Sequence, residues 1–169
     1  MKKVILFGVG IMFAFTMQAQ HVFNKGGFWM NAGIGAPSTN GYIPTVNFSG
    51  EIGVIPTGTI GIIAFGGLAE FQFGQYDFLN SKEGFPRFYI GPRASWHIQA
   101  FTSAVFDAYV GAGAGISISA KTDHFAAKTA VNPDVFVGGR WMFQPGMGLF
   151  AEAGFSGLSM LKFGITFGL

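Results

Sequence analysis

Apolar residues alternate with small or polar residues along several stretches of the chain. Between residues 88 and 98 one face carries Phe88, Ile90, Pro92, Ala94, Trp96 and Ile98, and the other carries Tyr89, Gly91, Arg93, Ser95 and His97. A period of two is typical of a β-strand with two chemically different faces. The same alternation recurs at 28–35, 107–119 and 162–169.

The residues opposite the apolar face are mostly Gly, Ser, Asn and isolated charges. The solvated face of a soluble sheet would instead carry long polar side chains. Small polar residues suit a crowded interior, and large apolar ones suit lipid. The pattern therefore predicts an all-β protein, a transmembrane up-and-down antiparallel β-barrel with an apolar outside and a polar lumen. Eight strands enclose only enough room for side chains, which accounts for the many inward glycines.

Eight strands are expected, each long enough to cross a membrane at a tilt. Their ranges are 27–36, 44–54, 59–73, 87–98, 106–119, 134–143, 148–156 and 160–169. The third strand changes phase, because Ile60 and Ile62 fit one face whereas Phe71 and Phe73 fit the other. We expect a β-bulge between the two pairs.

The connections alternate in length, and the long ones are expected to be extracellular. The long connections are 37–43, 74–86 and 120–133, and the shorter ones are 55–58, 99–105 and 144–147.

The composition supports this fold class. The chain has 169 residues, of which 27 are Gly and 11% are charged. Glycine destabilises a helix interior by about 1 kcal/mol relative to Ala. The large number of glycines therefore argues against a helical protein. The absence of Cys excludes a disulfide scaffold, a thiolate metal site and a lipoprotein anchor.

The N-terminal residues have the order of a secretory signal peptide. Lys2 and Lys3 precede the apolar stretch 4–17, and small residues up to Ala19 form a cleavage site. We expect residues 1–19 to be removed and residues 20–169 to form the barrel. The mature chain would then be formally neutral, so the basic isoelectric point does not indicate nucleic-acid binding.

Several short motifs resemble those of small outer-membrane β-barrels. They are Asn31 to Gly35, the pairs Glu51/Gly53 and Glu152/Gly154, Gly91 to Arg93, Asp107 to Gly111, Gly138 to Arg140 and the amphipathic last strand. Together they resemble the OmpA/OmpX-like porin-family barrels in the form common in Bacteroidota, which are Gram-negative. The resemblance covers the whole mature chain and implies an anchor, an adhesin or a lipid-modifying enzyme. It also implies that the barrel-assembly machinery reads the last strand.

Charged residues of both signs fall on the predicted lumen face. They are Glu51, Arg93, Asp107, Arg140, Glu152 and Lys162, and His97 shares that face. Opposite charges that satisfy each other can persist when they are buried. A tight turn near Gly157 would place Glu152 directly opposite Lys162. We favour a structural polar network that fills the lumen over a gated proton or ion path.

Other candidate sites are weaker. Ser95, His97 and Glu152 could form a hydrolase triad, but they point inward near the predicted periplasmic end. Asp123 and His124 are too few ligands to indicate a metal site. Hence no catalytic residue, metal or cofactor is predicted.

We therefore expect an integral outer-membrane barrel with a structural, anchoring or surface-interaction role. An outer-membrane lipid-modifying enzyme and a narrow solute pore remain alternatives, and a soluble β-sandwich is a further one. The expected partners are outer-membrane lipids and lipopolysaccharide, with no nucleic acid. The barrel is expected to be monomeric, with its N-terminus in the periplasm and its longer loops outside the cell.

Overall fold

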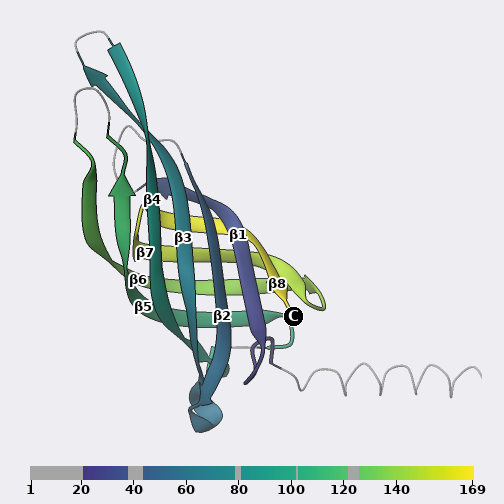
Figure 1. The fold of residues 1–169 in the computed structure, drawn as a ribbon. Helices are drawn as coiled ribbons and strands as arrows, with labels where there is room; N and C mark the ends of the chain where they lie inside the picture. Colours follow the sequence, from purple (N-terminus) through teal and green to yellow (C-terminus); the bar gives the residue numbers. More distant parts are fainter. Residues whose placement is uncertain (1–20, 38–43, 79–80, 102, 122–125) are drawn as a thin grey trace, which may run out of the picture.

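Eight antiparallel strands form a closed barrel in the computed structural model (Figure 1). The structure describes residues 21–37, 44–78, 81–101, 103–121 and 126–169, so the predicted signal peptide lies outside the described residues. The strands are β1 (Phe28–Pro37), β2 (Thr45–Pro56), β3 (Gly61–Phe78), β4 (Ser81–Ile98), β5 (Phe106–Ser119), β6 (Lys128–Gln144), β7 (Met147–Ser156) and β8 (Ser159–Gly168). Short 3-10 turns, η2 (Gly58–Ile60) and η3 (Gln99–Phe101), follow β2 and β4. In the described part of the chain, no helix has the length and apolar character to cross a membrane.

Each strand pairs with its sequence neighbours, and β1 also pairs with β8. The closing ladder runs from Trp29 opposite Gly168 to Pro37 opposite Ser159. Closure removes the two edges that an open sheet would present. The predicted fold class, an eight-stranded up-and-down antiparallel barrel, is confirmed.

The alternation along each strand sorts side chains between the lumen and the outside. Inward side chains are buried although many are polar, and Arg140 is 0% exposed. Outward side chains are exposed although most are apolar, and Ile90 is 66% exposed. This is the reverse of a soluble protein and matches a barrel whose outer wall faces lipid.

The predicted bulge within the third strand is wrong. β3 pairs with β4 without a register shift from Gly61 to Phe78, and Ile62 points into the lumen. The irregularity lies instead in β2, between Gly53 and Ile55. The outward position predicted for Ile62 was wrong because this apolar side chain belongs to an apolar cluster at one end of the lumen.

Strands extend into two of the predicted loops, 74–86 and 120–133. β3 and β4 continue as a paired hairpin as far as Phe78 opposite Ser81, and β6 begins at Lys128. These extensions lack a clear apolar face, so the alternation does not reveal them. The backbone pairing of each hairpin nevertheless continues past the point where the alternation stops.

The two ends of the barrel differ. The β3–β4 and β5–β6 hairpins project beyond the other strands at one end, which we call the hairpin end (upper part of Figure 1). The other end, which we call the turn end, carries the connecting residues 57–60, 99–101, 103–105 and 145–146 and the N-terminal segment 21–27.

Inward glycines let neighbouring strands approach each other, and Gly66 tests this. A Cβ at Gly66 would clash with the backbone of Gly50 and Glu51, whereas one at the adjacent, outward Gly67 would meet only the Gly91 carbonyl oxygen at 3.5 Å. We expect Gly66→Ala to lower the free energy of unfolding by about 1–3 kcal/mol. The matched Gly67→Ala should change it by less than about 0.5 kcal/mol. Urea unfolding midpoints in lipid vesicles measure both, and equal midpoints would contradict the close approach.

Candidate functional site

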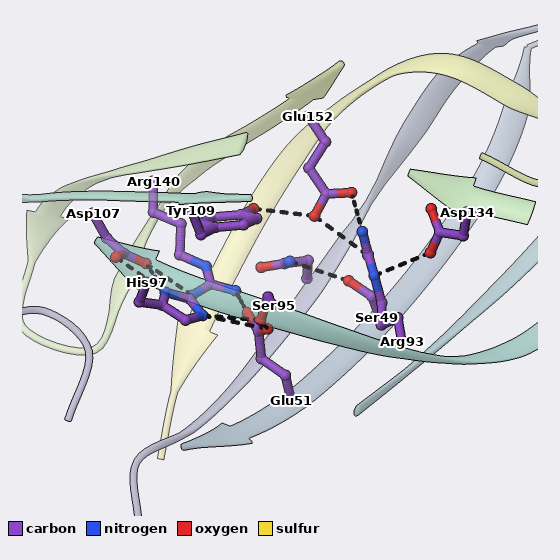
Figure 2. Close-up of polar contacts among 11 residues, drawn as sticks. Ser49, Glu51, Arg93, Ser95, His97, Asp107, Tyr109, Asp134, Arg140 and Glu152 are labelled. Atoms are coloured by element: carbon purple, nitrogen blue, oxygen red, sulfur yellow. Dashed lines mark hydrogen bonds and ion pairs between the residues drawn. The ribbon is translucent and has the colours of Figure 1, made fainter. Parts of the chain in front are cut away.

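The predicted polar residues all lie inside the lumen. Their exposed fractions are at most 7%, and they are Glu51, Arg93, His97, Asp107, Arg140, Glu152 and Lys162. They come from six strands, and their side chains meet in two groups, which Figure 2 shows without Lys162. We call the group that lies nearer the turn end the Arg140 cluster, and we call the other group the Arg93 cluster.

In the Arg140 cluster one guanidinium joins opposite walls of the barrel. Arg140 Nη1 donates to Asp107 Oδ2 at 3.1 Å, and Nη2 donates to Glu51. Asp107 is on the adjacent strand β5, whereas Glu51 is on β2, which pairs with neither β5 nor β6. A guanidinium suits this position because its planar donors can serve two carboxylates at once.

His97 completes the Arg140 cluster (Figure 2). Its Nδ1 lies 2.9 Å from Asp107 Oδ2, and its Nε2 lies 3.2 Å from Ser95 Oγ. The Ser95 hydroxyl donates to Glu51, so the four side chains and Arg140 form one connected network. Because both ring nitrogens have partners, the imidazole is fixed in orientation.

The Arg93 cluster lies on the other side of Tyr109. Arg93 pairs with Glu152 through two contacts of 3.0 and 3.3 Å, and its Nε lies 3.3 Å from Asp134. The Tyr109 hydroxyl donates to Glu152 at 3.1 Å. The register places Glu152 opposite Lys162, as the sequence predicts, and Lys162 Nζ lies 3.6 Å from its carboxylate.

A third polar group, which the sequence analysis missed, lies nearer the hairpin end. Glu70 accepts hydrogen bonds from the Ser159 hydroxyl and from the Leu158 amide, the latter at 2.6 Å. Thr45 in turn donates to Ser159 at 3.1 Å. These contacts tie β2 and β3 to the β7–β8 turn across the lumen. The sequence did hold a signal for Glu70, because it alternates with the outward Phe71 and Phe73.

Asp134 was also missed, although the sequence held a signal for it. It has the same parity along β6 as Arg140 and so faces the lumen, where it is 1% exposed. Its position at the start of the predicted strand concealed this.

The proposed serine triad is assembled only in part. Glu152 belongs to the Arg93 cluster, and Asp107 takes the place beside His97 instead. The Ser95 hydroxyl donates to Glu51 and also lies beside His97, so this arrangement connects β2, β4 and β5 across the lumen.

Within the ranges that the structure describes, no three His, Asp or Glu side chains are placed to hold a metal ion. Asp123 and His124 lie outside the described residues.

Comparison with known proteins gives distant likenesses only. No protein-family model matches the chain, and no curated protein matches it. Two crystal structures of Ail, the attachment invasion locus protein of Yersinia pestis, match over 86% of this chain and 96% of theirs. One, in complex with the heparin analogue sucrose octasulfate, has 12% identity and a TM-score of 0.42. The other has 14% identity and a TM-score of 0.34.

Matches with such low identities and TM-scores indicate nothing about function. The fold is established by the strand pairing itself. The chain is an eight-stranded barrel, and in this respect it is similar to the small OmpA/OmpX-type barrels that its motifs resemble.

Removing one charge from the Arg93 cluster tests whether the network supports the barrel. Glu152→Gln leaves Arg93 and Lys162 buried with one carboxylate fewer, so the free energy of unfolding should fall by about 3 kcal/mol. Lys121→Gln, which removes a charge at an exposed site, is the control and should leave it unchanged. Equal urea midpoints for Glu152→Gln and the unmodified protein would show that the network is not stabilising.

Proposed function

We propose that this protein is an outer-membrane β-barrel that presents a projecting sheet at the cell surface for interaction with other molecules. Its apolar outer wall supports insertion in a bilayer, because a soluble barrel would place these side chains inside. The side chains that fill the lumen support an anchoring role rather than a conducting one.

The observation that carries the proposal is the unpaired edge of the projecting sheet. Pairing between β6 and β7 ends at Asp134 opposite Ser156, yet β6 continues to Lys128 and remains paired with β5. Among the residues that the structure describes, no strand pairs with the other side of residues 128–133, which therefore form an edge. Free strand edges accept an extended segment from a partner by β-augmentation.

The side chains at this edge fit such a role. Val131 points outward and is 75% exposed, and Lys128 and Thr129 are exposed beside it. Pro133 lies in the same stretch, and proline is tolerated in a strand where its missing N–H would face a free edge. By the period of two, the backbone amides of Thr129 and Val131 also face that edge.

The orientation of the barrel is tested by labelling with cysteine. The chain has no Cys, so a single introduced thiol has no competitor. Thr129 is exposed at the hairpin end and Gln144 is exposed at the turn end, so Thr129→Cys and Gln144→Cys report on the two ends. In intact cells a membrane-impermeant maleimide should label Thr129→Cys only, and both should react after lysis. Labelling of Gln144→Cys alone in intact cells would reverse the proposed orientation.

The interaction role is tested at the edge itself. Val131→Pro removes one edge donor, whereas the matched Val131→Ala removes the side chain and keeps that donor. Cells are applied to immobilised serum and matrix proteins, and their retention is compared with that of a strain lacking the protein. Val131→Pro should lower retention to the level of the deletion strain, and Val131→Ala should retain more. Equal retention of wild-type and deletion strains would contradict a surface-interaction role.

A further inference from the structure

The segment before β1 enters the barrel at the turn end. Residues 21–27 belong to no strand, yet Phe23 is 1% exposed and lies in a cluster with Trp29, Ile62, Ala64 and Met142. A closed eight-stranded barrel does not need such a segment, since its strands already satisfy one another. The burial of Phe23 therefore requires its own explanation.

The pocket around Phe23 has features that favour an aromatic ring over other apolar groups. The Phe23 ring stacks on His97 with a centroid distance of 3.6 Å and an interplanar angle of 2°. Arg140 Cζ lies 5.7 Å from the ring centroid on the same pocket wall. Stacking and cation–π attraction both need a π-system, whereas the remaining apolar wall would accept any hydrocarbon.

The segment is held by few backbone hydrogen bonds. The Gly26 amide donates to Gly53 at 2.8 Å, the Gly53 amide donates to Gly27 at 3.1 Å, and the Val22 amide donates to Ser103 at 3.2 Å. The bond between Gly53 and Gly27 continues the β1–β2 register by one pair, because Phe28 lies opposite Ile52. Val22 and Phe23 lie beyond that register, and of the bonds above only the Val22 amide ties them to the barrel.

We propose that the turn end of the lumen is a binding site for an aromatic group, which Phe23 fills from within the chain. Residues 21–25 then act as a displaceable plug over the Arg140 cluster. When Phe23 withdraws, His97 and Arg140 face the compartment at the turn end, and the pocket accepts an aromatic ring from another molecule.

Access to the pocket is measured with a thiol placed beneath the plug. Ala64 lies in the Phe23 cluster and is fully buried. A water-soluble maleimide should therefore label the Ala64→Cys variant slowly. Adding Phe23→Ala should raise the labelling rate about tenfold or more, and Phe23→Leu should raise it less. Leu68→Cys, buried in a separate apolar cluster with Tyr89 and Leu158, is the control, and its rate should not respond to Phe23→Ala.

An unchanged rate at Ala64→Cys would overturn the plug, because Phe23 would then not control access. A parallel rise at Leu68→Cys, with a lowered urea midpoint, would also overturn it, since the barrel would be loosened throughout.

The preference for an aromatic group is tested by adding small probes to the Phe23→Ala, Ala64→Cys protein. Benzyl alcohol should slow the labelling towards the rate seen with Phe23 present, because its ring can stack on His97. Cyclohexylmethanol has a similar size but no π-system and should protect much less. Equal protection by the two alcohols, or none by either, would overturn an aromatic site.

Discussion

The structure depends on one constraint, which is that backbone amides and carbonyls cannot face lipid unpaired. A sheet meets this constraint only by closing, as β1 does on β8. Closure with eight strands leaves a narrow lumen, so inward positions must be small wherever strands or side chains crowd one another. Gly66 and Gly113 show this, because a Cβ at either would clash with the neighbouring backbone. The outward positions are free to be large and apolar.

Narrow closure also explains the charged interior. The lumen is too crowded to be a wide aqueous channel, so buried charges must satisfy one another. Arg140 joins β6 to β5 and β2, Arg93 joins β4 to β6 and β7, and Glu70 joins β3 to the β7–β8 turn. Each of these three residues has at least one partner on a strand or turn that does not neighbour its own strand in the sheet. The charges therefore fix the cross-section of the barrel, while the backbone ladders fix its wall.

The sequence predicted most of the fold because alternation reports directly on the two faces of each strand. It also predicted most of the charged residues that face the lumen from their parity, although Glu70 and Asp134 were missed. It could not predict which residues meet across the lumen. The sequence therefore did not show that Asp107, rather than Glu152, lies beside His97. The projecting parts of β3, β4 and β6 were missed because neither face is distinctly apolar there. Phe23 was missed because it lies outside any periodic segment.

The proposed barrel lies closed in the outer membrane, with its charges inside and its apolar side chains against lipid. The most direct test is the gel mobility of the outer-membrane fraction in SDS, with and without boiling. A closed barrel resists the detergent, so the unboiled protein should migrate faster than the boiled one. The protein could instead be recovered only in the soluble periplasmic fraction, with a single mobility under both conditions. That result would contradict a barrel whose apolar outer wall faces lipid.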